Sequence, residues 1–550
     1  MKRRRFVRMT AAATASALVP RMGSARSLQR DVLLRGGLVI DGSGAAPFEA
    51  DVRISGDRIA AVGARLDARD AEVVDIRGLA VASGFIDIHS HTDTELLEHP
   101  RAESKIRQGV TTEVAGQDGG SVAPDSGERA ASMHSEHPDV DIATLGGFFR
   151  GLEAREFAVN FASMVGAGTI RGEVIGDADR RATPDEIRRM QELVQQAIQD
   201  GACGLSSGLE YTPGGFADRA ELIALALPLK GTGLPYASHM RNEDDSLLSA
   251  IEEALHVGRL AEVPVQISHL KAQGQRNWWK ADAALATIDA ARKAGVDVHF
   301  DRYPYVAYAT GLSNLFPRWS RDGGMDAFLE RLRDGEAKAE IEASVREKVS
   351  QLGDWDAVQI TSTSQESLAW ARGRRLGALA KERGAEPYAL LVEIMLGDGG
   401  RTGMVGFGMS EENTEKILAH PLGMVCSDGS ALATEGPLRR GTPHPRSFGT
   451  FPRVLGHYVR ERRAMPIELA VRKMTAMPAA KLGLRDRGRL VRCAFADAVV
   501  FNPDAVGDRA TFEQPFAYPV GIEHVMVNGQ FVLRQGEHTG ALPGSVLRPG

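Results

Sequence analysis

The segment Gly84-Phe85-Ile86-Asp87-Ile88-His89-Ser90-His91 decides how this sequence is interpreted. It is an apolar run that ends in two histidines separated by one residue. In a β-strand, positions i and i+2 point to the same face, so His89 and His91 are predicted to present two imidazoles side by side. Imidazole is the commonest metal-binding side chain in proteins, so the segment predicts half of a metal site.

Three further polar residues lie at the ends of apolar runs farther along the chain. His239 ends the run 236–239, His269 ends the run 265–269, and Asp428 follows the run 424–427. One histidine of this kind is more often a satisfied polar residue than a metal ligand. Four histidines and one aspartate at matching positions favour a metal centre instead.

Between residues 82 and 484, short apolar runs alternate with helical patterns. Thr183-Pro184-Asp185-Glu186 is a capping box with proline at the first helical position, and Gly201 is placed to end that helix. Eight strands alternating with helices predict an α/β fold, a (β/α)8 barrel whose chemistry lies at the C-terminal strand ends. The strand candidates are 85–91, 111–116, 160–165, 204–207, 236–239, 265–269, 296–303 and 424–427.

The segments on either side of the barrel region have a different sequence pattern. Residues 28–81 and 485–550 contain short alternating patterns joined by glycine-containing turns. We therefore expect one small β-sandwich domain assembled from both ends of the chain. Within the barrel region the alternation stops at about 308–403, which is too long for a βα loop and predicts an inserted subdomain or lid.

Bulk composition excludes several classes of protein. The chain has 550 residues, enough for one large domain and a smaller one. A net charge of −6 gives no indication of nucleic-acid binding. The 3 cysteines form no CxxC pair, so neither a disulfide framework nor a thiolate zinc site is predicted. No segment is long and apolar enough to predict a membrane span.

The first residues differ from the rest of the chain. Lys2-Arg3-Arg4-Arg5-Phe6 is basic, residues 9–20 are mildly apolar, and Gly23-Ser24-Ala25 offers small residues for cleavage. This order predicts an export signal of the twin-arginine type over residues 1–27, and hence a periplasmic or secreted bacterial protein. The alternative interpretation is a basic disordered tail.

A set of motifs, in this order along the chain, resembles one family. The motifs are GFIDIHSHTD (84–93), GVTTEVAGQDG (109–119), SHMRNE (238–243), ISHLK (267–271), DRYPY (301–305), SDGS (427–430) and HPRSFGTFPRVLG (444–456). Over most of residues 30–530 the chain resembles the D-aminoacylases, or N-acyl-D-amino-acid deacylases, of the amidohydrolase superfamily. The resemblance implies a metal-dependent hydrolase that cleaves the amide bond of N-acyl-D-amino acids to a carboxylate and a free D-amino acid.

The resemblance also implies roles for the polar residues. His239 and His269 would hold a tightly bound zinc, His89 and His91 would occupy a more exposed metal position, and Asp428 would act as general base and then proton donor. Zinc acidifies water and polarises a carbonyl, while a carboxylate can take up and return the proton.

Two departures from the family concern the metal ligands. Many relatives in the superfamily carry a bridging lysine on the fourth strand, which here reads Gly204-Leu205-Ser206-Ser207. The D-aminoacylases have a cysteine ligand within a GNCG sequence, where this chain has Asp118. A carboxylate is a harder donor than a thiolate, so the exchange would weaken zinc selectivity or favour a second divalent metal. The alternatives are that Asp118 is only a turn residue and that Glu113, inside the strand, contributes instead.

Substrate binding is implied at three positions of the family pattern. Lys271, Tyr303 and Arg446 stand where family members bind the substrate carboxylate; otherwise they would be a solvated lysine, a core tyrosine and a surface arginine. Ala309 replaces a common family serine, so one carboxylate contact would be missing or replaced. Tyr211 and the pair Trp278-Trp279 are candidates for the acyl pocket.

Other functions compete with deacylation on the same pattern. A cyclic amidase of the dihydroorotase or hydantoinase type is disfavoured by the missing fourth-strand lysine. A D-dipeptidase suits an exported protein, and a non-enzymatic metal-binding protein would be expected to lack Asp428 or a histidine. The preferred side chain, the number of metals and the oligomeric state are left open by the sequence.

Overall fold

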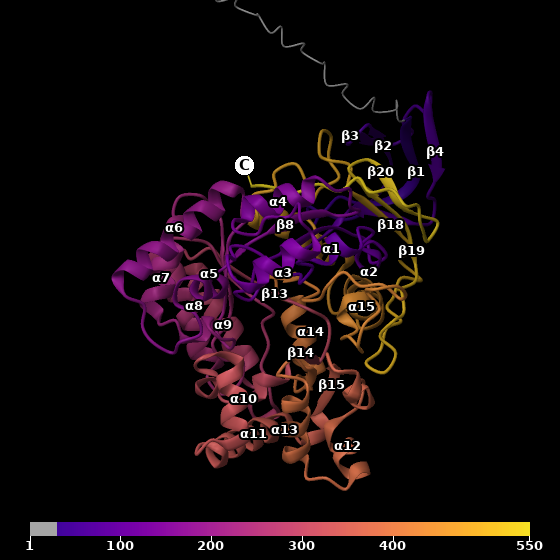
Figure 1. Ribbon diagram of the computed structural model, residues 1–550. Coiled ribbons are helices and arrows are strands. Elements are labelled where there is room, and N and C mark those ends of the chain that lie inside the picture. The colour runs from indigo at the N-terminus through magenta and orange to yellow at the C-terminus, as the bar shows by residue number, and fades with distance from the viewer. Residues whose placement is uncertain (1–29, 550) are drawn as a thin grey trace, which may run out of the picture.

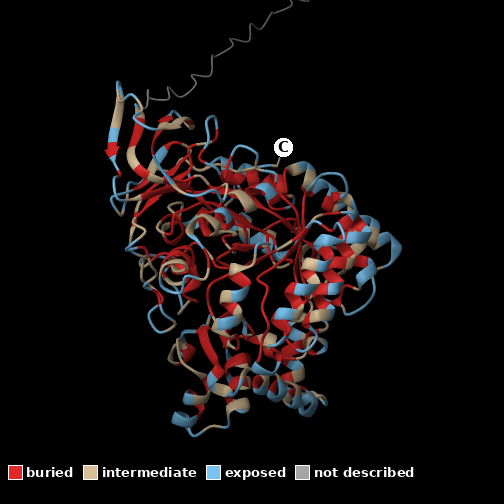
Figure 2. Cartoon of the chain, turned by 180° about the vertical axis from the view of Figure 1, so that it is seen from behind, coloured by how far each residue is buried: buried red, intermediate tan, exposed pale blue. Residues whose placement is uncertain are grey.

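The computed structural model describes residues 30–549, so the predicted export signal lies outside the described residues. Figure 1 shows a central set of strands wrapped by helices, with a β domain at one end and an inserted helical lobe at the other. Figure 2 shows that the central strands are buried and that the outer helices expose only their outward faces.

The central strands form two parallel sheets that follow one another around a ring. One has the order β6-β7-β8 and the other the order β9-β10-β11-β12-β13-β17, with every pairing parallel. The strands are β6 (Phe85–Asp87), β7 (Val110–Ala115), β8 (Asn160–Ser163), β9 (Val165–Gly166), β10 (Leu205–Gly208), β11 (Tyr236–His239), β12 (Val265–Ile267), β13 (Val298–Arg302) and β17 (Gly423–Val425). The short β8 and β9 are one run that changes partner at Met164, which gives the eight positions of the predicted barrel.

The ring is completed by the backbone beyond the strand ends. The Asp428 N–H donates to the His89 carbonyl at 2.8 Å, and the His91 N–H donates to the Gly429 carbonyl at 3.2 Å. These bonds join the segment after β17 to the segment after β6. The last strand is thereby placed next to the first at the edge where the predicted site lies.

Several observed strands are shorter than predicted at their C-terminal ends. The predicted strand 85–91 ends at Asp87, 265–269 ends at Ile267, and 424–427 ends at Val425. The chain turns there because the polar side chains converge on one point. His269 and Asp428 adopt left-handed backbone angles, with φ of 34° and 53°, which no regular strand contains.

Helices pack around the outside of the ring. The helix predicted from its capping box is α6 (Pro184–Asp200), with both reciprocal bonds of the box formed and Gly201 at its C-cap in the left-handed region. Helices that follow barrel strands are α4 (Leu145–Glu153), α5 (Ala167–Ile175), α7 (Arg219–Ala226), α8 (Leu247–Ala261), α9 (Lys280–Lys293), α14 (Glu411–Ala419) and α16 (Ile467–Met474). Shorter helices are α1 (Glu95–Glu98), α2 (Glu103–Ile106), α3 (Glu128–Glu136), α15 (Arg446–Arg453) and α17 (Ala476–Lys481).

The β domain is built from both ends of the described chain. Its nine strands form one hydrogen-bonded sheet in which β18 pairs antiparallel with β5, so the C-terminal part continues the N-terminal part. The sheet encloses its own apolar core, which includes Val32, Val52 and Val500. Its strands are β1 (Asp31–Ile40), β2 (Phe48–Ser55), β3 (Arg58–Gly63), β4 (Ala71–Asp75), β5 (Ala80–Ser83), β18 (Ala498–Phe501), β19 (Ile522–Val527), β20 (Gln530–Arg534) and β21 (Glu537–His538).

The insertion predicted at about 308–403 corresponds to residues 307–407. Its three-stranded antiparallel sheet has the order β14-β16-β15, with strands at Ala307–Gly311, Gly403–Phe407 and Val358–Ser362. Four helices pack on it: α10 (Gly324–Asp334), α11 (Lys338–Leu352), α12 (Leu376–Arg383) and α13 (Pro387–Gly397). Its buried residues belong to the same apolar cluster as Ile86 and Val114 of the barrel, so the lobe is packed onto the ring. Among the helices of residues 30–549, none combines the length and apolar character needed to cross a membrane.

Candidate active site

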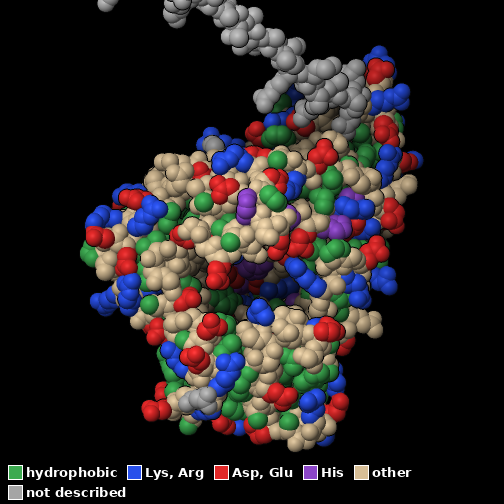
Figure 3. Space-filling view, in the orientation of Figure 1, with side chains coloured by type: hydrophobic (Ala, Val, Ile, Leu, Met, Phe, Trp, Pro, Cys, Tyr) green, Lys and Arg blue, Asp and Glu red, His purple; other side chains and the backbone are tan. Residues whose placement is uncertain are grey.

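The predicted site residues meet in one cavity at the C-terminal edge of the barrel strands. The cavity has a volume of about 780 Å³, and Figure 3 shows the surface hollowed between the barrel and the inserted lobe. Its lining includes His91, Asp118, His239, His269, Lys271, Tyr303, Asp428 and Arg446, while His89 lies just beneath, fully buried. Strand β14 of the insertion supplies one wall through Tyr308, Ala309 and Thr310.

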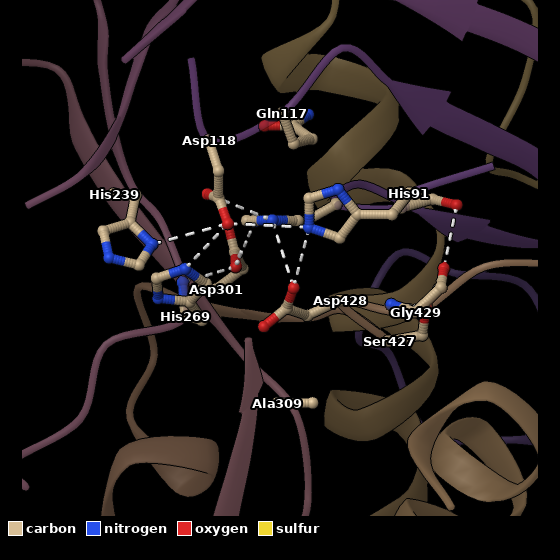
Figure 4. Close-up of polar contacts among 12 residues, drawn as sticks. His91, Gln117, Asp118, His239, His269, Asp301, Ala309, Ser427, Asp428 and Gly429 are labelled. Carbon is tan, nitrogen blue, oxygen red and sulfur yellow. Dashed lines mark hydrogen bonds and ion pairs between the residues drawn. The ribbon is translucent and has the colours of Figure 1, made fainter. Parts of the chain in front are cut away.

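Asp118 is the centre of the cluster. Its carboxylate oxygens lie 3.3 Å from His89 Nε2, 3.5 Å from His91 Nε2, 3.4 Å from His239 Nδ1 and 3.3 Å from His269 Nε2. Figure 4 shows His239 and His269 on one side of this carboxylate and His91 on the other. The residue at the family's cysteine position therefore lies among all four predicted histidine ligands.

Asp428 faces the same cluster from the opposite side. Its Oδ1 atom lies 3.0 Å from His91 Nε2 and 3.6 Å from His89 Nε2. Its Oδ2 atom accepts a hydrogen bond from Arg446 Nη1 at 2.7 Å, and both partners are buried. The carboxylate is thus anchored at one oxygen and directed toward the histidines with the other (Figure 4).

Three residues of the cluster have strained backbones. Asp118, His269 and Asp428 adopt positive φ angles of 53°, 34° and 53°. Non-glycine residues in the left-handed region cost free energy and persist where the surroundings fix them, often at functional sites. Here each of these turns directs a side chain into the same cavity.

Two carboxylates behind the histidines orient the rings. Asp301 on β13 lies 3.4 Å from His89 Nδ1 through Oδ1, which also accepts the His269 backbone N–H at 2.7 Å. Glu243 lies 3.0 Å from His269 Nδ1. Carboxylates in such positions support the orientation of histidine rings that bind a metal.

The electrostatics of the cluster are dominated by its carboxylates. Burial alone would lower the pKa of His91, but its hydrogen bonds to Asp118 and Asp428 outweigh that effect and raise the pKa to about 9. For His239, burial is likewise outweighed by the charge of Asp118, and the pKa rises to about 10. Burial would raise the pKa of Asp428, but the Arg446 guanidinium and the neighbouring histidines hold it well below its ordinary value. The site therefore concentrates negative charge where a cation would be bound.

The donor set fits a divalent metal. Both ring nitrogens of His89, both of His239 and Oδ1 of Asp118 are buried without a hydrogen-bond partner. Buried polar atoms normally have hydrogen-bond partners, so several unpartnered ring nitrogens and a carboxylate oxygen at one place fit the binding of a metal ion. Ligand atoms of His89, His91, Asp118 and Asp428 lie within 4.8 Å of one another, and so do those of Asp118, His239 and His269. Imidazole and carboxylate are ligands that suit zinc.

Neither histidine of the opening segment lies in a strand, although their rings are adjacent as predicted. The ring centroids of His89 and His91 are 5.4 Å apart. The backbone there is held by neighbouring segments, since the Ser90 N–H donates to the Val114 carbonyl at 2.9 Å. Glu113, the weaker ligand candidate, lies elsewhere: its carboxylate contacts Lys105 at 2.8 Å and accepts a hydrogen bond from Ser90 Oγ at 2.7 Å.

Two of the three residues predicted to bind the substrate carboxylate are already paired with carboxylates of the protein. Lys271 Nζ lies 2.6 Å from Glu243 Oε1, and Arg446 is paired with Asp428. The Tyr303 hydroxyl, in contrast, is buried without a hydrogen-bond partner. All three side chains face the cavity, and the Tyr303 hydroxyl is the donor that has no competing acceptor.

Of the residues considered for substrate specificity, Tyr211 and Ala309 line the cavity and the tryptophan pair does not. Tyr211 lines the cavity, with its ring 4.6 Å from that of His239. The prediction for the tryptophan pair was wrong, because neither lines the cavity: the indole of Trp278 donates to the Gly408 carbonyl, and Trp279 is 65% exposed. Ala309 lines the cavity and contributes its backbone, which accepts a bond from Arg446 Nη2 at 3.4 Å.

Sequence reasoning missed Asp301 and Glu243 as supporting residues. Asp301 follows apolar positions of β13, and Glu243 ends the SHMRNE motif. A charged residue inside an apolar strand is costly unless it is paired, and this was the available signal for Asp301. Its partner on a different strand is not visible from sequence.

Comparison with known proteins identifies the family. A sequence model of the amidohydrolase family matches residues 72–533. A D-aminoacylase of Alcaligenes xylosoxydans xylosoxydans is 38% identical over 96% of this chain and 99% of its own length. A crystal structure of an N-acyl-D-glutamate deacylase from Bordetella bronchiseptica superposes on this chain with a TM-score of 0.80 and 36% identity. The superposition covers 94% of this chain and 99% of that one. That deacylase is complexed with zinc and with a phosphonate inhibitor that mimics the tetrahedral intermediate of the reaction.

A further solved structure bears on the metal centre. A D-aminoacylase described as having a binuclear metal centre superposes with a TM-score of 0.78 and 38% identity, covering 94% of this chain and all of the other. The motifs, the ring of strands and the metal-binding cluster agree with these comparisons. The chain belongs to the amidohydrolase family and, within it, to the D-aminoacylases.

Proposed function

We propose that the protein is a zinc-dependent hydrolase that cleaves N-acyl-D-amino acids to a carboxylate and a free D-amino acid. The observation that carries this proposal is the arrangement of Asp428, which faces His91 with one oxygen and Arg446 with the other. A carboxylate so placed can exchange a proton beside a metal cluster and next to a carboxylate-binding arginine. The relatives that act on N-acyl-D-amino acids support the choice of substrate.

Zinc, when bound by His89, His91, Asp118, His239 and His269, would supply an acidified water and polarise the scissile carbonyl. The protein groups perform the proton transfers. Asp428 Oδ1 takes the proton released as water adds to the carbonyl carbon, and delivers it to the leaving nitrogen as the C–N bond breaks. The products are then a carboxylic acid and an amine, which leave as carboxylate and ammonium after the acid proton passes to the amine, and Asp428 returns to its ionised form.

Recognition of the substrate carboxylate is assigned to Tyr303 and Arg446. The Tyr303 hydroxyl is an unused donor in a buried position. Arg446 can keep one nitrogen on Asp428 while a second nitrogen, now 3.4 Å from the Ala309 carbonyl, turns to the ligand. Lys271 instead neutralises Glu243 and so fixes His269.

Asp118 governs how many metals bind. Because its carboxylate lies between the two histidine pairs, we propose that Asp118, His239 and His269 would hold one tightly bound zinc, and that His89, His91 and Asp118 would hold a second divalent metal. Asp118→Ala should lower bound zinc to well below one ion per chain, while Asp118→Cys, which introduces the cysteine of the family pattern, should retain zinc. Elemental analysis of both variants measures this directly, and full zinc in Asp118→Ala would reject Asp118 as a ligand.

The first experiment combines metal analysis with hydrolysis of paired N-acetyl-D- and N-acetyl-L-amino acids. We expect zinc-loaded protein to turn over the D forms at least about 100-fold faster than the L forms, and chelation to abolish the activity. Equal rates on both enantiomers would contradict D selectivity. Bound zinc without turnover of either form would move the assignment to a cyclic amide or a D-dipeptide, which serve as the next substrates.

We also propose that residues 1–27 export the protein by the twin-arginine route. The basic Lys2-Arg3-Arg4-Arg5-Phe6 segment and the small residues at 23–25 support this. Replacing Arg3, Arg4 and Arg5 together with lysine should retain the protein in the cytoplasmic fraction of an expressing bacterium. Unchanged recovery from the periplasm would reject the twin-arginine assignment.

A further inference from the structure

A fully buried lysine lies beneath the site, outside the metal cluster. Lys105 is on α2 and has an exposed fraction of 0%, as have Asp87 and Glu113, the two carboxylates that neutralise it. Its Nζ atom lies 2.8 Å from Asp87 Oδ2 and 2.8 Å from Glu113 Oε1. Burial opposes its charge, but the two carboxylates raise the pKa of Lys105, so the ammonium stays protonated.

The same ammonium also holds the loop that carries the general base. Lys105 Nζ donates to Ser427 Oγ at 3.0 Å and to the Gly429 carbonyl at 2.8 Å, the residues on either side of Asp428. Ser427 is held a second time, because its backbone N–H donates to Asp87 Oδ1 at 2.8 Å. Figure 4 shows Ser427 and Gly429 together beside Asp428, below His91.

These contacts connect β6, β7 and the segment after β17. Within the described residues, no β-ladder pairs β17 with β6. Asp87 ends β6, Glu113 lies in β7, and Ser427 follows β17. Between β17 and β6 the ring is joined by single bonds such as that from the Asp428 N–H to the His89 carbonyl. The Lys105 ammonium adds a charged cross-link to these direct bonds at the seam.

Asp428 needs such support because its backbone is strained. Its φ of 53° costs free energy, which the surrounding contacts must offset for the carboxylate to stay near His91. The hydrogen bonds from Lys105 end on the two neighbouring residues and on no atom of Asp428 itself. They can set the turn without competing for the carboxylate.

We propose that Lys105 is a positioning residue for the reaction: it fixes the turn 427–429 and thereby the place of Asp428 opposite His91. The proposal rests on the proposed function of Asp428 as general base. It differs from a purely structural role, because it requires that loss of the ammonium lower kcat in molecules that are folded and hold zinc.

The test uses the zinc-loaded full chain and two independent variants. Lys105→Met combined with Glu113→Gln removes the amine together with one of the carboxylates it would leave unpaired. Ser427→Ala removes one contact of Lys105, together with the bonds of the hydroxyl to Asp87 and from the Gly429 N–H, and leaves every charge in place. We expect kcat to fall about 10- to 100-fold in the double variant and a few-fold in Ser427→Ala, with KM within about twofold and zinc content unchanged.

Lys473 provides a matched control at the other end of the same strand. It is fully buried, and its Nζ donates to the carbonyl of Gly423, the first residue of β17, at 2.8 Å. Lys473→Met should lower the melting temperature and leave kcat per folded molecule within about twofold. Equal losses of kcat in this control, or a wild-type kcat in the double variant, would overturn the proposal.

A crystal structure of the double variant tests the same point without any activity. We expect the distance from Asp428 Oδ1 to His91 Nε2 to exceed hydrogen-bond range, and an unmoved Asp428 would overturn the proposal. A wild-type enzyme inactive on N-acyl-D-amino acids would instead reject the proposed function. The displacement of Asp428 still decides the role of Lys105 in that case.

Discussion

Both ends of the barrel bury charged side chains, but they satisfy them differently. At the N-terminal end, Asn160 of β8, Asp497 and Asn528 form a network in which every side-chain oxygen and nitrogen has a hydrogen-bond partner, with Arg487 as the cation. At the C-terminal end, the nitrogens of His89 and His239 and an oxygen of Asp118 have none.

This contrast distinguishes buried groups that stabilise the fold from buried groups that can bind a ligand and take part in catalysis. A satisfied network has nothing left to bind, so the network around Asp497 serves to join the barrel to the β domain. Unsatisfied buried groups cost free energy and are retained where a ligand completes them. In parallel barrels the C-terminal strand edge carries the active site, and the unpartnered atoms of His89, His239 and Asp118 lie together at that edge.

The largest effect is expected at Asp428. Asp428→Asn keeps the shape of the side chain and removes its ability to take up a proton, so kcat should fall about 1,000-fold or more. Zinc content should stay unchanged, because Asp118 and the histidines remain. Steady-state kinetics with elemental analysis measures both quantities. A loss of less than about tenfold would show that another group transfers the proton.

Asp301 offers a smaller effect with an internal control on the same strand. Asp301→Asn weakens the contact with His89, and disrupted support of a metal ligand costs about 10- to 100-fold in metal affinity or activity. Asp297 directly precedes β13 at its other end and pairs with Lys481 and Arg292. Asp297→Asn should leave zinc affinity and kcat within about twofold. Titration of zinc into both variants, after chelation, compares the two ends of one strand.

The candidate ligands and the candidate general base could be proposed from the sequence because their signal is local. His89, His91, His239, His269 and Asp428 each follow an apolar run, and the barrel brings such ends together without further information. Asp118 was predicted from the family pattern, and its central place among the histidines agrees with that interpretation. The three-part division of the chain was likewise visible as changes of pattern.

What the sequence could not predict depends on contacts between distant segments. The roles of Asp301, Glu243 and Lys105 are set by partners on other strands, and no local pattern encodes them. The strands at β6, β12 and β17 were predicted too long because the predicted runs extend to polar residues that lie beyond the end of the hydrogen-bonded ladder. The positive φ angles of Asp118, His269 and Asp428 are imposed by the site, against the preference of these residues.

The charge at the site also predicts a pH effect that only the metal-free protein shows. The pKa values of about 9 for His91 and about 10 for His239 exceed the ordinary value of 6.5, because carboxylates surround both rings. A raised folded-state pKa stabilises the fold fully below pH 6.5, and this stabilisation is lost as pH rises through 9 to 10. The melting temperature of metal-free protein should therefore fall across this range.

Zinc-loaded protein is the control for this pH effect. Metal-bound imidazoles carry no titrating proton, so the contribution of these histidines should be absent. Lys473 and Lys481, whose pKa values burial lowers to about 7 and about 8, change stability in the opposite sense, but they do so in both forms. The difference between the two melting curves therefore isolates the site. Parallel curves from pH 6.5 to 10 would show that the histidines are not charged in the metal-free fold.

The smallest effect on turnover is expected at the satisfied end of the barrel. Asp497→Asn removes the charge that pairs with Arg487 and leaves a buried guanidinium uncompensated, which costs about 3–5 kcal/mol when a buried pair is broken. The Asn528 backbone N–H also loses its bond to a charged acceptor. Denaturant unfolding should therefore show a clear loss of stability, while kcat per folded molecule stays within about twofold. A matching loss of kcat would mean that the two ends are coupled through the strands, and the separation of stability from chemistry would then fail for this barrel.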